Sequence, residues 1–281
     1  MVELMFWLLA ALALLGVVVW LVGAREPVFA IARRGPHWFV ALRMREPAFD
    51  LAPGVRINWA SAADFAFVGA QESYWSHFYI LSGGEAGQAP LRAEGAQDAF
   101  VARLDLMRPP VLALGLVRML VALGVLSRPH GAVMVDAQAL GYRADAMPSA
   151  GAIATLMAKP ADYAPAMVNF LAYRGAAAYP DGRAASGRAA YMRYGRVAMR
   201  TVYRTGGRLL FYGRVAQIVR PAQAGPCTGQ WHDIAAMRYN RPEGILSMEH
   251  APDYRAVLKD RDAGLDRTVV IASHPLPGNG A

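Results

Sequence analysis

The feature that most constrains this chain is an unbroken apolar run near its N-terminus. Leu4 through Ala24 are 21 residues without a charge. A helix of that length spans the hydrocarbon core of a bilayer, about 30 Å. We expect an uncleaved membrane anchor. The alternative is a cleaved signal peptide with Val22 and Ala24 as small cleavage-site residues, but Met1–Glu3 holds no lysine or arginine and the run exceeds the usual apolar length.

The flanking charges predict an orientation for this anchor. Arg25, Arg33, Arg34, Arg43 and Arg45 all follow the apolar run, and no basic side chain precedes it. The positive-inside rule therefore predicts a single-pass inner-membrane protein with its following domains in the cytoplasm. A second apolar run, Pro109–Leu126, is interrupted by Arg118. Because an arginine at mid-bilayer is costly, we interpret that run as a buried or membrane-resting helix.

Charge and cysteine content exclude several classes of protein. The net charge is +8, and only Lys159 and Lys259 of the 29 basic residues are lysines. Apart from the adjacent pair Arg33–Arg34, the arginines are spread singly rather than clustered with aromatic residues, which argues against nucleic-acid binding and favours anionic lipid. Cys227 is the single cysteine, so the chain has no internal disulfide and no cysteine-built metal site. A length of 281 residues with 55% hydrophobic content favours two ordered domains.

The C-terminal half shows a regular order of elements. The pattern predicts, in order, a strand at Ala166–Arg174, a helix at Ala185–Thr205 ended by Gly206–Gly207, strands at Arg208–Val219 and Gln230–Tyr239, a helical segment at Pro242–Leu265 broken near Ala251–Pro252, and a strand at Thr268–Ser273. This β-α-β-β-α-β order is typical of a ferredoxin-like domain, in which two helices cover one face of a four-stranded antiparallel sheet.

The same stretch resembles a known family. Pro148–Ser273 is similar to the DUF1330 family of the dimeric α/β-barrel superfamily, through AMVNFLAYR (166–174), SGRAAYMRYG (186–195), GGRLLFYGRV (206–215), WHDIAAMRY (231–239) and the run from Met248 to Thr268. One departure is Asn240–Arg241, which precede Pro242 where the family often has proline directly after the tyrosine. The resemblance implies a ferredoxin-like fold. Superfamily members include cofactor-free monooxygenases, haem-degrading enzymes and isomerases that hold ligands between sheet and helices, which is an analogy of fold only.

The preceding region suggests a second copy of this order. We predict strands at His37–Arg45, His77–Leu81, Ala99–Met107 and Gly131–Leu140, with helices at Ser61–Ser76 and Pro109–Leu126. Residues 36–141 would then be a divergent ferredoxin-like copy, and the two copies would form an α/β barrel within one chain. An irregular α+β domain is the alternative. The expected organisation is an anchor at 1–25, domains at 26–145 and 146–275, and a flexible tail at 276–281.

No strong catalytic motif is present, so candidate site residues come from polar positions in apolar elements. The catalytic candidates are His232 and Tyr194. The candidates for binding a substrate are Asn169, Arg174, Tyr191, Arg214, Arg238 and Tyr239. Asn169 interrupts an apolar strand, and the arginines and phenols suit a small carboxylate or phenolic ligand. Each of these residues also has an ordinary structural interpretation. Met248, His250 and Tyr254 near the helix break could form one wall of a pocket.

Two functional hypotheses follow. The first is a membrane-anchored protein that binds a small apolar or aromatic molecule, with cofactor-independent oxidoreductase or isomerase activity as one possibility. No metal or cofactor is implied. The second is a non-catalytic accessory or docking subunit of a membrane protein complex. An enclosed cavity with Asn169 or His232 facing it would favour the first, and an exposed apolar patch over a filled core would favour the second.

Overall fold

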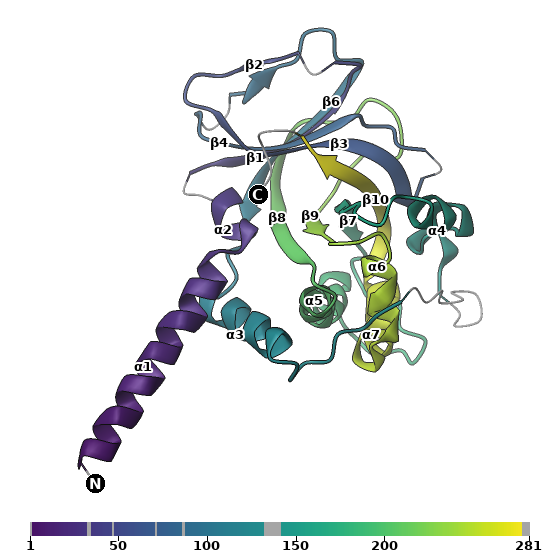
Figure 1. The fold of residues 1–281 in the computed structure, drawn as a ribbon. Coiled ribbons are helices and arrows are strands. Elements are labelled where there is room, and N and C mark those ends of the chain that lie inside the picture. Colours follow the sequence, from purple (N-terminus) through teal and green to yellow (C-terminus); the bar gives the residue numbers. More distant parts are fainter. Residues whose placement is uncertain are drawn as a thin grey trace.

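The computed structural model is a mixed α and β protein built on a closed antiparallel barrel of eight strands (Figure 1). It describes residues 2–32, 35–46, 48–70, 72–85, 88–131 and 142–276. The barrel strands are β1 (His37–Arg43), β3 (Arg56–Val68), β4 (His77–Ser82), β6 (Asp98–Leu106), β7 (Ala166–Tyr173), β8 (Arg208–Arg220), β9 (Asp233–Arg238) and β10 (Leu265–Pro275).

Strands from both halves of the chain close the barrel. The order around it is β1-β4-β3-β10-β7-β9-β8-β6. The first half therefore forms the arc β6-β1-β4-β3 and the second half the arc β10-β7-β9-β8. In each arc the strands follow the order fourth, first, third, second of that half. The arcs join where β10 pairs with β3 and where β6 pairs with β8.

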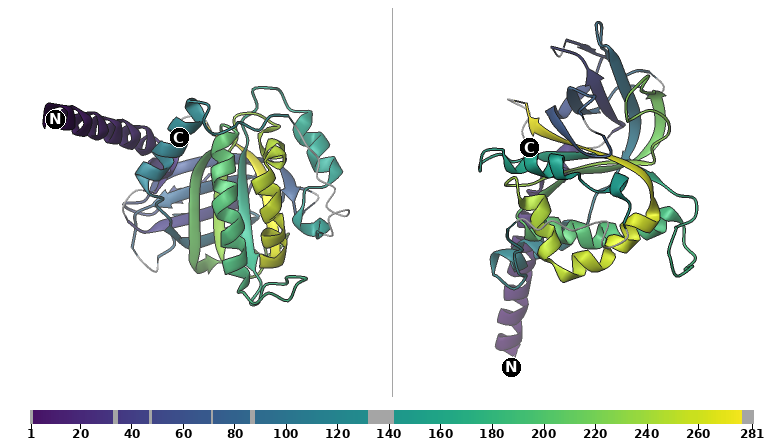
Figure 2. Two further views of the ribbon diagram at one scale, coloured as in Figure 1. Left: turned by 90° about the horizontal axis from the view of Figure 1, so that it is seen from below. Right: turned by 90° about the vertical axis from the view of Figure 1, so that its right-hand side faces the viewer.

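Helices cover the outer face of the C-terminal arc. They are α5 (Gly187–Arg204) and α7 (Pro252–Gly264), which lie side by side over the strands (Figure 2). The Ser186 hydroxyl caps α5 by accepting a hydrogen bond from the Ala189 N–H. The short helix α6 (Gly244–Ser247) and a 3₁₀ turn (Met248–His250) precede α7. The helical break predicted near Ala251–Pro252 is confirmed, and so are all four strands predicted for this half.

The N-terminal arc differs from its prediction in its helices. The helix expected at Ser61–Ser76 is wrong, because most of that stretch belongs to strand β3 or to the loop after it. The short strands β2 (Asp50–Leu51) and β5 (Leu91–Arg92) pair with each other outside the barrel. The helix predicted at Pro109–Leu126 is present as α3 (Val111–Ala122), whereas most of the strand predicted at Gly131–Leu140 lies outside the described residues.

The interior of the barrel is filled by aromatic side chains. Phe39, Phe78, Phe100, Phe170 and Phe211 are all fully buried there. The Phe39 ring lies 5.4 Å from Phe170 and 6.0 Å from Phe78, measured between centroids. The first of these contacts is edge-to-face and the second is stacked, and aromatic pairs of both kinds add to the stabilisation from burial. The barrel interior is thus a packed core, and a ligand site has to be sought on its outside.

Helix α1 (Val2–Ala24) projects away from the barrel (Figure 1). Its residues Glu3–Ala24 are long and apolar enough to cross a membrane, and only 6% of the apolar window is buried. A signal sequence would pass the same test. The C-terminal part of α1 packs on α3 at two glycines. A Cβ added to Gly115 would lie 1.9 Å from the Val19 carbonyl oxygen, and one added to Gly23 would lie 2.1 Å from the Val111 oxygen. Because glycine carries only a hydrogen atom where other residues carry a side chain, α1 and α3 can cross this closely.

An ion pair explains the arginine that interrupts the second apolar run. Arg118 on α3 lies 3.1 Å from Glu26, whose side chain is only 3% exposed. Glu26 directly precedes α2 (Pro27–Ile31). Burial raises the pKa of Glu26, and the nearby Arg118 and Arg208 oppose that shift. Arg118 therefore partly neutralises a buried carboxylate at the junction between α1 and the barrel. The additional short helix α4 (Ala150–Met157) packs beside β3.

Candidate functional site

A cavity of about 510 Å³ lies between the outer face of the C-terminal arc and the helices that cover it. Its walls come from the strands, from α5 and α7, and from the segment that leads into α3. Methionine and tyrosine dominate the lining: Met107, Met147, Met167, Met192, Met199, Met237 and Met248, with Tyr191, Tyr194, Tyr212, Tyr239 and Tyr254. Methionine adapts to irregular apolar ligands, and tyrosine adds a polar tip to an apolar ring.

Strand alternation determines which side chains reach this cavity. On β7, Val168 and Phe170 point into the barrel core, whereas Met167, Asn169 and Leu171 line the cavity. The Asn169 side-chain amide donates a hydrogen bond of 2.7 Å to the Met167 carbonyl of its own strand. Asn169 thereby places a polar group on an otherwise apolar floor.

The part of the cavity near α7 contains an acidic and a basic side chain. Glu249 and Arg261 both line it, beside the hydroxyls of Tyr194 and Tyr254, which lie 3.1 Å apart. The Glu249 Oε2 atom is buried and has no hydrogen-bond partner among the described residues. Burial raises the pKa of Glu249 to about 7, although Arg261 and Arg255 oppose the shift. Burial also raises the pKa of Tyr194, so its phenol stays protonated at neutral pH. Glu249 is therefore the group in the cavity suited to exchanging a proton near neutrality.

This pKa predicts how stability depends on pH. Because the pKa of Glu249 is higher in the folded chain, the folded state binds a proton more tightly, and stability falls as pH rises from about 4.5 through 7. Glu249→Gln should abolish this loss and be more stable than the wild type at pH 8, by up to about 3 kcal/mol. At pH 5 the two should differ little. Thermal unfolding at both pH values tests this, with the exposed Glu94→Gln as the control. A gain for Glu249→Gln that is the same at both pH values would contradict it.

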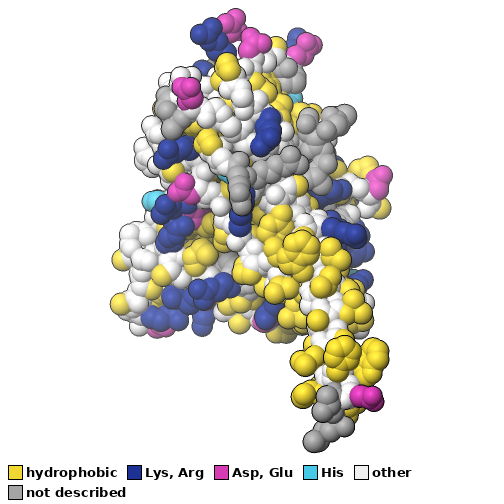
Figure 3. Space-filling model, turned by 90° about the vertical axis from the view of Figure 1, so that its left-hand side faces the viewer, with side chains coloured by type: hydrophobic (Ala, Val, Ile, Leu, Met, Phe, Trp, Pro, Cys, Tyr) yellow, Lys and Arg dark blue, Asp and Glu magenta, His cyan; other side chains and the backbone are white. Residues whose placement is uncertain are grey.

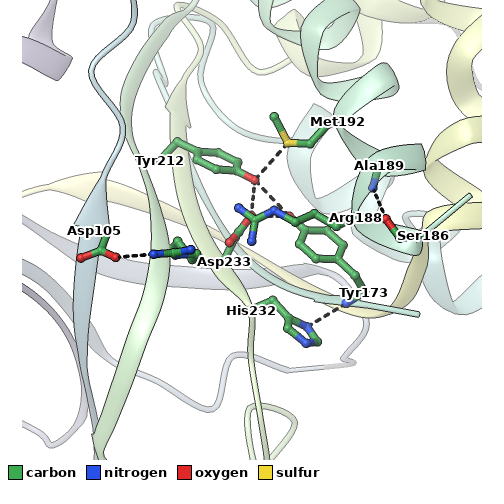
Figure 4. A network of polar contacts seen from close by, with 10 residues as sticks. Asp105, Tyr173, Ser186, Arg188, Ala189, Met192, Tyr212, His232 and Asp233 are labelled. Atoms are coloured by element: carbon green, nitrogen blue, oxygen red, sulfur yellow. Dashed lines mark hydrogen bonds and ion pairs between the residues drawn. The ribbon is translucent and has the colours of Figure 1, made fainter. Parts of the chain in front are cut away.

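A second polar cluster surrounds the buried carboxylate of Asp233 (Figure 4). Its Oδ2 atom accepts hydrogen bonds from Tyr173, at 2.7 Å, and from Tyr212, and lies 3.3 Å from the Arg188 guanidinium. Burial raises the pKa of both phenols, so they remain donors. Tyr212 also lines the cavity. The cluster thus fixes one wall of the cavity at the junction of β7, β8 and β9.

The structure brings four of the eight predicted site residues together. Asn169, Tyr191, Tyr194 and Tyr239 all line the cavity, as do Met248 and Tyr254 from the proposed wall. Tyr239 is buried and donates a hydrogen bond to the Met248 sulfur at 3.5 Å.

The other four predicted residues do not line the cavity. His232 is exposed, and its Nδ1 accepts a hydrogen bond from the Tyr173 N–H at 3.0 Å. Arg174 donates to the Leu265 carbonyl. Arg214 forms an exposed ion pair with Asp105. Arg238 and His250 are also absent from the lining.

Sequence reasoning missed Glu249 and Arg261. Both are charged residues in a segment predicted to be helical, and such residues are usually solvated. Their place in the cavity depends on how the 3₁₀ turn and α7 pack under α5, which no local pattern encodes. Asp233 was visible only as the neighbour of His232. Within the described residues, no group of three histidine, cysteine, aspartate or glutamate side chains could hold a metal ion.

Fold and cavity define a mixed α and β protein with a closed antiparallel barrel and an external apolar cavity. No protein family model matches the chain, and no curated protein matches it. The chain is similar to the crystal structure of methylated RPA0582 protein, with 30% identity, coverage of 47% of this chain and 95% of that chain, and a TM-score of 0.42. It is also similar to a structure of RPA0582, a protein of unknown function from Rhodopseudomonas palustris, with 27% identity, 46% and 95% coverage, and a TM-score of 0.41.

Proposed function

We propose that this protein is a membrane-anchored binding protein for a small apolar or aromatic molecule, held in the cavity between the C-terminal arc and α5 and α7. The observation that carries the proposal is the cavity itself, which measures about 510 Å³ and has an apolar lining with few polar groups. Both properties are typical of sites for small organic ligands. The polar groups in its lining include Glu249 and Arg261, Asn169 on β7 and Tyr212 on β8.

The position of α3 supports access to the cavity from the bilayer. Met107, Pro110 and Ala113 form part of the cavity wall, and the last of these belongs to the first turn of α3. The same helix exposes Leu112 and Leu116 and packs on α1. If α1 crosses the membrane, α3 lies near the membrane surface, so an apolar ligand dissolved in the lipid would meet the cavity wall without passing through bulk water.

We further propose that any chemistry in this cavity is a proton-transfer isomerisation. Glu249 would remove a proton from a carbon next to a carbonyl group and return it to another carbon of the same molecule. Tyr194 would donate a hydrogen bond to the carbonyl oxygen as it gains charge. Such a reaction needs no oxidant, reductant or cofactor. An oxidoreductase would need a co-reactant as well, so the residues favour the isomerase class.

The test is to purify the protein from its native membranes in mild detergent and identify retained small molecules by native mass spectrometry. A small apolar or aromatic molecule bound to the chain supports the proposal. The variant Gly195→Phe tests whether the ligand binds in this cavity, because Gly195 lines the cavity and a Cβ added there meets no atom within 4 Å. The ring should occupy part of the cavity, obstruct the ligand and lower its retention by tenfold or more, without lowering the melting temperature.

Gly195→Ala is the matched control. It should keep the ligand and gain about 0.5–1 kcal/mol, because alanine replaces glycine inside a helix. Equal ligand retention in Gly195→Phe and Gly195→Ala would mean that the ligand binds elsewhere, and a wild-type protein without any small molecule would refute the proposal.

The second candidate function is an accessory or docking subunit. One observation favours it, namely the exposed apolar side chains on and after α3, which are Leu112, Leu116, Leu123 and Val125. Such a patch fits a lipid surface or a neighbouring membrane protein. The same purification separates the two functions, because a stoichiometric protein partner without a small molecule would support the docking role.

The finer fold and location are proposals too. We propose that both arcs are ferredoxin-like copies and that the C-terminal one is of the DUF1330 type. The shared strand order of the arcs supports this, although no pair of helices covers the first arc among the described residues. We also propose that α1 crosses the inner membrane with the barrel in the cytoplasm, on the strength of the arginines that follow it. Protease digestion of spheroplasts should then leave the barrel intact.

A further inference from the structure

A second, basic cavity lies beside the C-terminal half of α3 and the end of α1. It measures about 600 Å³ and is lined by Val22 of α1, by Arg118, Met119, Val121 and Ala122 of α3, by Arg128, Pro129 and His130 after it, by Arg204, Thr205 and Gly206 at the end of α5, and by Asn240 and Arg241 after β9. The lining contains four arginines and, among the described residues, no acidic side chain. The cavity is thus positively charged, whereas an ordinary protein surface carries charges of both signs.

Two of these arginines are already engaged in holding the structure. Arg118 pairs with Glu26. Arg204 donates to the Ser127 carbonyl at 2.9 Å and to its hydroxyl at 2.7 Å, and lies 3.1 Å from Asp253. Arg204 therefore anchors the loop that carries Arg128 and shapes the cavity.

The other two arginines are available to a ligand. Arg128 is exposed and donates one hydrogen bond, of 3.2 Å, to the Val121 carbonyl. Among the residues that the structure describes, it has no carboxylate partner. Arg241 is 48% exposed and makes a peripheral ion pair of 3.3 Å with Glu243. Both keep guanidinium N–H groups that can bind a phosphate.

The apolar part of the lining indicates what carries that phosphate. Val22 lies two residues before the end of the apolar helix, so the cavity stands at the depth where a bilayer changes from acyl chains to headgroups. Met119, Val121 and Ala122 add apolar surface beside the arginines. Figure 3 shows hydrophobic side chains along α1 that continue onto the adjoining body, with lysine and arginine side chains on the body nearby. A free phosphate would use only the charges, whereas a phospholipid would use both surfaces.

We infer that this cavity binds the phosphate group of an anionic phospholipid, with Arg128 and Arg241 as its principal donors and the acyl chains along α1 and α3. The inference rests on the proposed membrane anchoring by α1 but is independent of the ligand in the Met- and Tyr-lined cavity.

The experiment uses the full chain in mild detergent and native mass spectrometry. Phosphatidylglycerol and phosphatidylcholine with identical acyl chains are added in equal amounts. The wild type should retain phosphatidylglycerol preferentially, with one molecule bound per chain. Arg128→Gln/Arg241→Gln should lower that retention by about tenfold or more. The matched control is Arg92→Gln/Arg220→Gln, which removes two exposed arginines, one on β5 and one on β8, and should retain the lipid as the wild type does.

Three results would overturn the inference. The first is equal retention of the two lipids, and the second is an equal loss of lipid in the control variant. The third is displacement of the lipid by an equimolar amount of inorganic phosphate, which would assign the cavity to a soluble anion. Gly195→Phe should keep the phospholipid, so failure of the small-molecule proposal leaves this one standing. Release of the protein from membranes by alkaline carbonate would instead show that the anchoring had failed.

Discussion

Asp233→Ala should lower the free energy of unfolding by about 3 kcal/mol, because it removes a fully buried carboxylate that accepts hydrogen bonds from two phenols. Tyr173 and Tyr212 would keep their mutual contact of 3.0 Å, and Tyr212 its weak contact with the Met192 sulfur. For a domain of this size the loss corresponds to a fall in melting temperature of roughly 10 °C. Thermal unfolding of the detergent-solubilised protein measures it.

Asp105→Ala is the matched control for this prediction. Asp105 also pairs with an arginine, but its side chain is 55% exposed and that of Arg214 is 61% exposed. The loss should stay below about 1 kcal/mol, since exposed ion pairs contribute little. Similar losses in the two variants would show that the Asp233 cluster does not support the junction of β7, β8 and β9.

Gly115→Leu should separate α1 from α3. The added Cβ would lie 1.9 Å from the Val19 carbonyl oxygen, so the helices have to move apart by about 2 Å or more to restore normal contact. Spin labels at Leu12→Cys and Leu123→Cys, both on exposed positions, report the change as a longer and broader distance distribution. Cys227 does not interfere, because it is buried and burial raises its pKa to about 12.

Gly16→Leu provides the comparison within α1 itself. A Cβ at Gly16 meets no atom within 4 Å, so the same substitution should leave the distance distribution unchanged. If both variants gave the same broadening, close packing at Gly115 would not be what holds the anchor against the barrel.

The C-terminal half could be predicted from sequence because its elements have clean periodicity and clear stops. Ser186 begins α5, and Gly206 ends it with a positive φ of 85°. The N-terminal half failed at β3, for two physical reasons. The stretch is rich in alanine, which favours helices. In addition, the pairing of β3 with β10 contains register shifts, which reverse the side of the sheet to which odd-numbered residues of β3 point. Trp59 and Ala63 therefore contact the barrel core, whereas Phe65 and Phe67 pack on the outside.

The site was only partly predictable, because some of its residues are brought together by tertiary packing that leaves no local sequence pattern. Residues such as Asn169 and Tyr194 stood out because a polar group interrupts an apolar pattern or joins a cluster of phenols. Glu249 gave no such signal, because its burial arises from tertiary packing. His232 was conspicuous in the sequence, yet its Nδ1 accepts a backbone hydrogen bond outside the cavity. The side chains of His232 and Asp233 point in different directions, as expected for adjacent residues of an extended chain.

The barrel is completed within a single polypeptide, and this has a consequence for binding measurements. A barrel assembled from two identical subunits would present two equivalent helix-covered faces and would come apart on dilution. Here the paired arcs are covalently joined, and α5 and α7 cover one arc while the other carries β2 and β5. Saturation of the Met- and Tyr-lined cavity should therefore follow a simple hyperbola with one equivalent per polypeptide, a Hill coefficient of one, and a midpoint that does not change with protein concentration.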